Sequence, residues 1–245
     1  DAAAGAGIVI TMLADETAVQ AMLEGDDGVL RRMPEGAVHI GMSTVSVAFS
    51  RQLAARHRDR GQHYVAAPVF GRPDAAAAKR LWIVAAGPAE ALRLAHPVLS
   101  AMGLGVTELG EDPGLANTVK LAGNHLIAGM IQALGESFCL VRKAGLPADR
   151  FLEVVNRLFK SPVYENYGRQ IAEETFIPAG FKLRLGLKDM RLVLAAADDG
   201  EVPMPLASLL HDRLLTAVAR GMDEMDWSAV TQLAADDAGL SRRGE

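Results

Sequence analysis

The chain of 245 residues contains a single cysteine, Cys139, so it cannot form an internal disulfide bond. Disulfide bonds are typical of oxidising compartments and rare where thiols stay reduced. We therefore expect a protein of a reducing compartment, the cytoplasm. Because Cys139 falls in a long apolar helical stretch, we expect it to be a buried packing residue and not a nucleophile.

No apolar run reaches the roughly twenty uninterrupted residues that a membrane-spanning helix needs, so we expect no membrane partner. The formal net charge of -5 argues against nucleic acid as a partner. The histidines show no spacing typical of metal ligands, and we predict no metal site. Only two tryptophans are present, Trp82 and Trp227, and we expect both to be ordinary core anchors.

A glycine-rich strand-turn-helix of the kind that cradles a pyrophosphate is also missing from the sequence. The glycines of Gly5-Ala-Gly7 come before an apolar strand pattern, and no helix pattern follows them directly. The sequence starts at Asp1 and enters this strand pattern within a few residues, so we expect it to begin in mid-fold.

Up to Gly110, two patterns alternate along the chain. Short apolar, β-branched runs predict buried parallel strands, and the stretches between them predict helices. The strand runs are residues 8–13, 37–41, 63–66, 81–86 and 106–109, and the helical stretches are 15–24, 47–60 and 88–102. This alternation predicts an α/β fold with a largely parallel sheet. His39 alternates with strand residues and is expected to be a packed core histidine.

After Gly110, every pattern is helical. The predicted helices are residues 113–143, 147–159, 163–174, 181–198, 205–220 and 227–235, separated by glycine and proline breaks. We therefore predict an α/β half and an all-α half, joined by the long first helix of this series.

The long helix opens at Asp112-Pro113 and closes before Gly145, which gives a length of about 45 Å. It is apolar almost all round, so we expect it to be buried on several sides. Lys120 and Asn124 are four residues apart and share one face, with Asn117 one turn earlier. A lysine among apolar residues either has a function or extends its amine to the surface, and this helix alone leaves both open.

Four short motifs follow the strand end Met12-Leu13 in a fixed order. They are Gly41-Met-Ser-Thr-Val-Ser46, Ala67-Pro-Val-Phe-Gly71, Lys120-Leu-Ala-Gly-Asn124 and Leu187-Lys-Asp189. With these motifs, the chain from about Gly7 to its C-terminus resembles the β-hydroxyacid dehydrogenase family. That family includes 3-hydroxyisobutyrate dehydrogenase and glyoxylate/succinic semialdehyde reductases and, more distantly, 6-phosphogluconate dehydrogenase and imine reductases.

The resemblance implies a Rossmann-type dinucleotide-binding domain over residues 1–112, and a long interdomain helix with an all-α domain over residues 113–245 that forms a homodimer. Lys120 resembles the family's catalytic lysine, which exchanges a proton with the substrate hydroxyl during hydride transfer. The pKa of a lysine, about 10.4 in water, must fall for this role, and apolar surroundings would lower it. Asn124 would hold the same substrate oxygen, and Asp189 is expected to fix local structure.

The resemblance also implies contacts to the substrate and the cofactor. Ser43 and the backbone around Gly71 would hold the substrate carboxylate. Leu13, Thr44 and Lys188 would lie against the cofactor. Ser43 and Thr44 follow a predicted strand, at the edge where open α/β sheets bind ligands.

Several residues depart from the family pattern. The family often has Ser-Gly-Gly where this chain has Phe70-Gly71-Arg72, and we expect this change to reshape the substrate pocket. Arg72 either binds a second carboxylate or is an ordinary surface arginine. Of the amide pair that often follows the lysine, only Asn124 remains, because Gly123 takes the first place. These departures leave the specific substrate open.

In the family, the glycine-rich turn and the residue that selects the coenzyme lie in the first several dozen residues, which have no counterpart here. We therefore predict NAD or NADP as cofactor without choosing between them. We expect the native protein to be longer than this sequence. If the sequence is instead the whole product, it would bind a dinucleotide poorly, and residues 8–13 would form an exposed apolar strand edge.

The predicted function is NAD(P)-dependent hydride transfer between nicotinamide and a small 3-hydroxy acid or the matching semialdehyde or keto acid. Lys120 favours carbonyl–alcohol chemistry, because imine reductases usually have Asp or Tyr at this position. Two alternatives stay open: an imine or other carbonyl reductase of the same superfamily, and a non-catalytic dimerisation module built on the helical half.

Overall fold

The computed structural model describes residues 2–240 of the chain. The chain divides into two compact units, Asp1–Gly123 (unit 1) and Asn124–Glu245 (unit 2). Helix α6 (Gly114–Lys143) is continuous through the point where unit 1 ends and unit 2 begins. The domain boundary predicted at residue 112 therefore stays a prediction. No helix in residues 2–240 combines the length and apolar character that crossing a bilayer requires.

Unit 1 contains two small sheets, whose strands are β1 (Ile8–Thr11), β2 (Val38–Gly41) and β3 (His63–Ala66), and β4 (Val69–Phe70), β5 (Leu81–Ala85) and β6 (Gly103–Glu108). Neighbours in the order β1-β2-β3 are parallel, as are β5 and β6, whereas β4 is antiparallel to β5. An antiparallel bridge between Ala66 and Ala86 connects the ends of β3 and β5. The predicted α/β class with a largely parallel sheet is confirmed.

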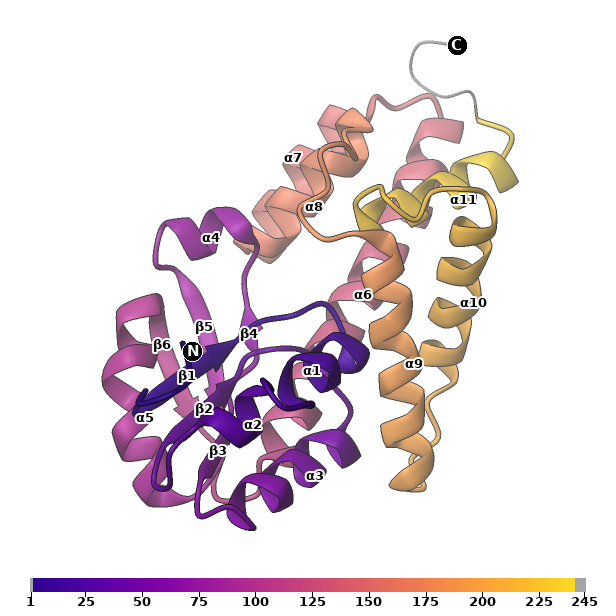
Figure 1. The fold of residues 1–245 in the computed structure, drawn as a ribbon. Coiled ribbons are helices and arrows are strands. Elements are labelled where there is room, and N and C mark those ends of the chain that lie inside the picture. The colour runs from indigo at the N-terminus through magenta and orange to yellow at the C-terminus, as the bar shows by residue number, and fades with distance from the viewer. Residues whose placement is uncertain (1, 241–245) are drawn as a thin grey trace. The chain divides into compact units, whose positions relative to one another are not determined.

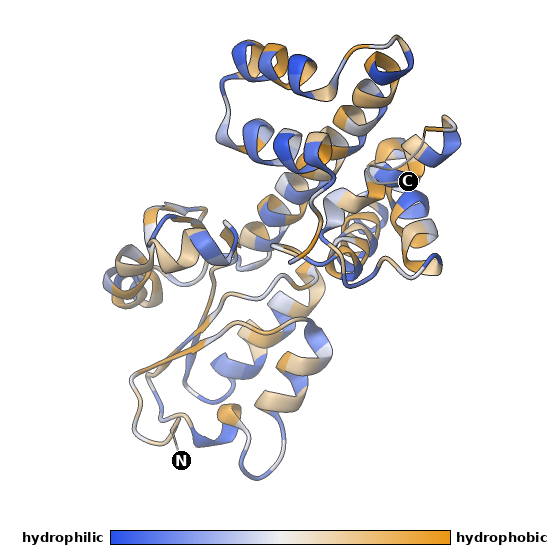
Figure 2. Ribbon diagram, turned by 90° about the horizontal axis from the view of Figure 1, so that it is seen from above, coloured by the Kyte–Doolittle hydropathy of each residue, from blue (hydrophilic) through white to orange (hydrophobic). Residues whose placement is uncertain are grey.

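Helices lie on both faces of these strands (Figure 1), and they are α1 (Glu16–Leu23), α2 (Val29–Arg32), α3 (Val47–Arg58), α4 (Pro73–Ala77) and α5 (Ala89–Met102). Alternate residues of a strand face opposite ways, so each strand contributes to two cores. Val65 and Ile83 pack with Leu99 of α5 on one face. Tyr64 packs with Leu53 of α3 on the other. Figure 2 shows the apolar colours along the strands that this layering buries.

Local sequence signals account for where the first helices begin. The Asp15 carboxylate accepts a hydrogen bond from the backbone N–H of Ala18 at 2.8 Å, so Asp15 caps α1. The Ser46 hydroxyl oxygen caps α3 in the same way, accepting from the N–H of Phe49 at 3.1 Å. Together, these caps fix where the chain leaves β1 and β2.

Three short elements and one tryptophan differ from the sequence-based expectation. α2, α4 and β4 were not predicted, because segments of two to five residues carry too little periodic pattern. Trp82 is 49% exposed and is not a core anchor. Its neighbours Leu81 and Ile83 point into the core, so the alternation of β5 places Trp82 on the opposite face. There its indole N–H donates to the Thr107 hydroxyl at 3.1 Å.

Unit 2 is all-α, as predicted. After α6 it contains α7 (Ala148–Phe159), α8 (Pro162–Glu173), α9 (Leu183–Asp199), α10 (Pro205–Ala219), the 3-10 helix η1 (Trp227–Val230) and α11 (Thr231–Asp237). Trp227 is a buried anchor, as expected: its ring packs edge-on against Phe181, and its N–H donates to the Tyr167 hydroxyl at 2.8 Å. The buried Asp226 carboxylate accepts from the N–H groups of Gly180 and Phe181 and so fixes the turn before α9.

The long helix α6 has the predicted extent, and Gly145 follows it with a left-handed φ of 84°. The expectation that it is buried on several sides is wrong for one face. Ile131 and Phe138 are buried, but Leu126 and Leu140 are 71% and 73% exposed. Residues seven positions apart recur on one face of a helix, so these leucines form an apolar stripe together with the exposed Ala133 between them.

Candidate functional site

Lys120, the predicted proton-transfer residue, is half-buried on α6. Its amine nitrogen lies 4.4 Å from the centroid of the Phe70 ring, over the face of the ring. An ammonium group in this position is attracted by the negative face of the aromatic ring. The lysine is therefore held against an apolar group of its own unit.

Ser43 and Leu13, predicted to contact substrate and cofactor, lie beside each other. The Ser43 hydroxyl oxygen is buried and accepts a hydrogen bond from the backbone N–H of Leu13 at 2.8 Å. The two residues meet because β1 and β2 are parallel and in register, with Thr11 opposite Gly41, so both strands end at the same edge. Thr44 is half-buried and next in the chain. Ligands of open α/β sheets bind at this edge.

Asn117 ties α6 to the loop after β2. Its side-chain oxygen accepts from the backbone N–H of Val45 at 3.4 Å, and the residue is only 1% exposed. Its side-chain nitrogen is buried and has no hydrogen-bond partner among residues 2–240. A buried donor without a partner carries an energetic penalty. The sequence placed Asn117 on the side of Lys120 but gave no signal for this orphaned donor.

Gly71 has a structural reason to be glycine. Its φ is 143°, and a Cβ atom there would lie 2.6 Å from a methyl carbon of Leu81. The backbone at this position therefore excludes other residues. Whether the backbone around Gly71 contacts the substrate carboxylate stays a prediction.

In unit 2, Asp189 connects two predicted site residues. The Asn124 side-chain N–H donates to one carboxylate oxygen of Asp189 at 2.5 Å, and the Lys188 amine lies 3.1 Å from the other. Asp189 is 1% exposed, so its charge needs this compensation. The expectation that Asp189 fixes local structure agrees with these contacts. That Lys188 reaches the cofactor stays a prediction.

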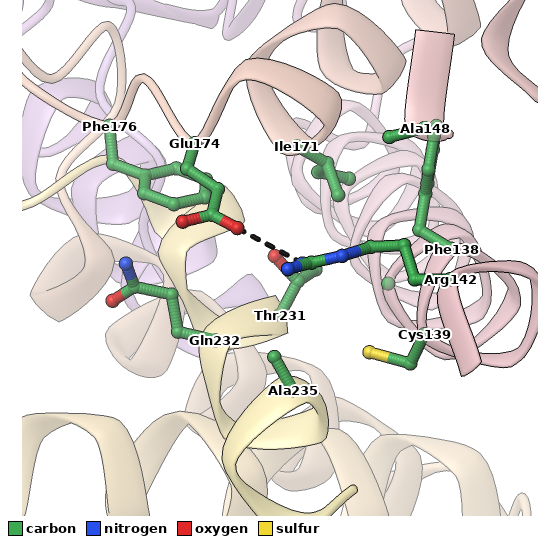
Figure 3. A pocket seen from close by; sticks show the side chains of 11 residues that line it. Phe138, Cys139, Arg142, Ala148, Ile171, Glu174, Phe176, Thr231, Gln232 and Ala235 are labelled. Carbon is green, nitrogen blue, oxygen red and sulfur yellow. Dashed lines mark hydrogen bonds and ion pairs between the residues drawn. The ribbon is translucent and has the colours of Figure 1, made fainter. Parts of the chain in front are cut away.

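Unit 2 contains a small cavity (Figure 3). It has a volume of about 20 Å³, and the ion pair between Arg142 and Glu174, at 3.0 Å, contributes to its wall. This is room for about one water molecule. Cys139 also lines it, and burial raises the pKa of its thiol, which keeps it in the unreactive form. The cavity is too small for a substrate, and none of the predicted site residues lines it.

Two family models together match most of the chain. Residues 1–110 match the family model of the NAD-binding domain of 6-phosphogluconate dehydrogenase, and residues 114–234 match that of the NAD-binding region of NADP-dependent 3-hydroxyisobutyrate dehydrogenase. The chain is 47% identical to the uncharacterized oxidoreductase YfjR of Bacillus subtilis over 229 aligned residues. The alignment covers 94% of this chain and 80% of that protein. This chain belongs to the β-hydroxyacid dehydrogenase family. As a member of it, the chain is an NAD(P)-dependent oxidoreductase that acts on CH–OH groups.

Other members of the family extend the comparison. Glyoxylate/succinic semialdehyde reductase 1 of Arabidopsis thaliana is 30% identical over 224 residues, which cover 91% of this chain and 77% of that enzyme. The crystal structure of a 3-hydroxyisobutyrate dehydrogenase from Salmonella typhimurium superposes with a TM-score of 0.86 at 27% identity, covering 94% of this chain and 80% of that one. The β-hydroxyacid dehydrogenase fold is therefore present in both units.

The residues of unit 1 supply the strand-end part of a dinucleotide site. Leu13, Ser43 and Thr44 lie at the carboxyl edge of parallel strands, where open α/β sheets bind dinucleotides. No group of three or more His, Cys, Asp or Glu side chains in the described part of the chain is placed to hold a metal ion.

Proposed function

We propose that this dehydrogenase transfers hydride between NAD or NADP and a small 3-hydroxy acid or the matching semialdehyde or keto acid. The observation that carries the proposal is the position of Lys120 and Asn124, one turn apart on one unbroken helix. Side chains four residues apart on a helix are neighbours on one face, so an amine and an amide can reach the same substrate oxygen. This pairing suits a proton transfer at a hydroxyl group.

The proton and the hydride leave the substrate by separate routes. In the oxidation direction, the unprotonated amine of Lys120 accepts the hydroxyl proton as the carbon–oxygen double bond forms, and in reduction the ammonium returns it. The nicotinamide, when bound, supplies the acceptor or donor of the hydride at its C4 atom. Asn124 binds the reacting oxygen, and its bond to Asp189 fixes the plane of its amide.

The substrate carboxylate is held by unit 1 in this proposal. The Ser43 oxygen already accepts the Leu13 N–H, so its own O–H points elsewhere and can donate to a carboxylate. The backbone around Gly71 contributes a second contact. Leu13, Thr44 and Lys188 contact the cofactor.

Replacement of Lys120 tests the mechanism. Lys120→Ala is expected to lower kcat by about 10²–10⁴-fold, the usual contribution of a general acid–base group, while circular dichroism and coenzyme binding stay unchanged. The assay is the change in NADH and NADPH absorbance with a panel of 3-hydroxy acids, semialdehydes and cyclic imines. Full activity of Lys120→Ala, or turnover of imines alone, would overturn the proposal.

We further propose a homodimer formed through unit 2, in the cytoplasm. Support for the dimer comes from the exposed leucines of α6, Leu126 and Leu140, and from exposed apolar side chains on other helices of the unit, namely Val154 and Leu158 on α7 and Leu206 and Leu209 on α10. Apolar patches of this kind are typical of protein–protein contacts. The single cysteine supports a reducing compartment.

A further inference from the structure

Phe70 and Gly123 are in direct contact, although they are far apart in the sequence. A Cβ atom built on Gly123 would lie 2.4 and 2.5 Å from two carbons of the Phe70 ring. Carbon atoms that are not bonded do not approach so closely, because their attraction is greatest near 3.5–4.0 Å. The ring therefore occupies the space that any side chain at position 123 would need.

The same ring covers Lys120. Its centroid lies 4.4 Å from the lysine amine, and Lys120 and Gly123 are three residues apart, neighbours on one face of α6. One aromatic ring thus spans a turn of the helix, with its face on the amine and its edge at the glycine. Neither Phe70 nor Gly123 offers a side-chain hydrogen-bonding group in the immediate surroundings of that amine.

We propose that Phe70 and Gly123 form a coupled specificity determinant, which selects hydroxy acids with an apolar substituent beside the reacting carbon over acids that carry further hydroxyl groups. This inference rests on the proposed role of Lys120. A substrate hydroxyl placed against the ring and the glycine would lose its water without gaining a partner, which is unfavourable. An alkyl group placed there would instead be removed from water, which is favourable.

The contact also accounts for two departures from the family pattern, which are Phe70 in place of serine and Gly123 in place of an amide residue. A small residue at position 70 would leave a space beside Gly123, and a large residue at position 123 would collide with Phe70. Each residue is suited to the other, so the effect of a change at one position depends on the residue at the other.

A double-mutant cycle on folding tests the contact without any assay of activity. Gly123→Ala alone is expected to lower the urea midpoint of unfolding, because the new methyl group collides with the ring. In a Phe70→Ala background, the same change is expected to raise the midpoint, because alanine has a higher helix propensity than glycine.

The control is Gly129→Ala on the same helix, where the nearest atom to a new Cβ is a methyl carbon of Leu206 at 3.3 Å. It should have the same effect in both backgrounds. If Gly123→Ala shifted the urea midpoint in the same direction in the wild-type and Phe70→Ala backgrounds, the coupling would be overturned.

The second measurement tests specificity. The wild-type protein is expected to show a higher kcat/KM for 3-hydroxyisobutyrate than for L-threonate, which carries additional hydroxyl groups. In the Phe70→Ser/Gly123→Asn variant, this ratio should fall by about 10-fold or more, the scale of a single pocket contact. An unchanged ratio in an active double variant would overturn the selectivity. If the wild-type protein turns over no hydroxy acid, the proposed function and the selectivity both fail, whereas the folding cycle still decides whether the two residues are coupled.

Discussion

The Nδ1 atom of His39 lies 2.9 Å from the Nε2 atom of His57 in the interior of unit 1, where both residues are fully buried. Gln62 sets the direction of this hydrogen bond. Its NH₂ group donates to the carbonyl oxygens of Leu30 and Met33, at 3.1 and 2.7 Å, so its side-chain oxygen faces Nδ1 of His57 at 2.9 Å. His57 must then carry its proton on Nδ1 and accept at Nε2 from Nδ1–H of His39.

The same chain of bonds ends at the candidate site. Nε2 of His39 lies 2.9 Å from the hydroxyl of Thr11, which is the last residue of β1 and two residues before Leu13. Both nitrogens of each neutral ring are engaged and buried, and a proton added to Nε2 of His57 would displace the hydrogen bond that Nδ1–H of His39 donates there. The network thus holds the strand end next to the Leu13–Ser43 contact.

We predict that both histidines are Nδ1–H tautomers at neutral pH. The measurement is a nitrogen–proton correlation spectrum of the protein with ¹⁵N-labelled histidine, in which Nδ1 should show the protonated shift and Nε2 the unprotonated shift for His39 and His57. His96 is a reference for an exposed ring, whose Nδ1 atom lies 3.3 Å from the Ser100 hydroxyl. A protonated Nε2 on either buried ring would show that the direction of the chain is wrong.

Stability should fall in mild acid because of these histidines. Burial lowers the pKa of His39 to about 3, with a contribution from His57, and burial lowers that of His57 to about 4, helped by Arg56 and Arg60 and opposed by the Gln62 hydrogen bond. The unfolded chain takes up protons below about pH 6.5, whereas the folded protein does not until about pH 4. Stability is therefore complete above pH 6.5 and is lost as the pH falls toward 4, by about 1.4 kcal/mol per pH unit for each histidine.

The check is urea unfolding at a series of pH values between 4 and 7. His57→Gln should reduce the slope of stability against pH by about half, since one of two titrating rings is gone. His96→Gln removes an exposed histidine and should leave the slope as in the wild type. A wild-type stability that does not change between pH 7 and pH 5 would contradict the assignment.

Ser43 and Ser46 offer a matched pair of substitutions in one loop. Each hydroxyl oxygen accepts one backbone N–H, from Leu13 at 2.8 Å and from Phe49 at 3.1 Å. Ser43→Ala and Ser46→Ala should each lower the free energy of unfolding by about 1 kcal/mol. If Ser43 also holds the substrate carboxylate, Ser43→Ala alone should raise KM, by about 10-fold. Equal KM values for the two variants would remove Ser43 from the substrate site.

Asp189 is expected to act through Asn124 and Lys188. Asp189→Asn keeps the shape of the side chain but removes the charge that faces Lys188, so the free energy of unfolding should fall by on the order of 3 kcal/mol, as for other buried ion pairs. The Asn124 amide would then have a weaker acceptor, and kcat should fall more than KM rises. Asp198→Asn changes an exposed carboxylate on the same helix and should alter neither quantity. A variant with wild-type kcat would limit Asp189 to a role in folding.

Local sequence signals predicted the parts of the fold that depend on neighbours in the chain. Gly145 marked the end of the long helix, and the β-branched runs marked the parallel strands, because end signals and periodicity act over a few residues. His39 was correctly expected in the core. Its partner His57 was not singled out, since the free energy of burying a polar side chain depends on hydrogen-bond partners elsewhere in the fold. The contact of Phe70 with Gly123 likewise joins a strand to a helix and leaves no local pattern.

The exposed leucines of α6 are the place where the sequence predicted burial and the single chain does not provide it. Leu126 and Leu140 are 71% and 73% exposed, and they share one face with Ala133. If a second copy of the chain covers this stripe, Leu126→Glu/Leu140→Glu should convert a dimer into a monomer, because two buried carboxylates without partners oppose association. The measurement is light scattering coupled to size-exclusion chromatography. Val202→Glu places the same charge on another exposed apolar residue, in the turn after α9, and should leave the dimer intact. A double glutamate variant that stays dimeric would move the interface away from α6.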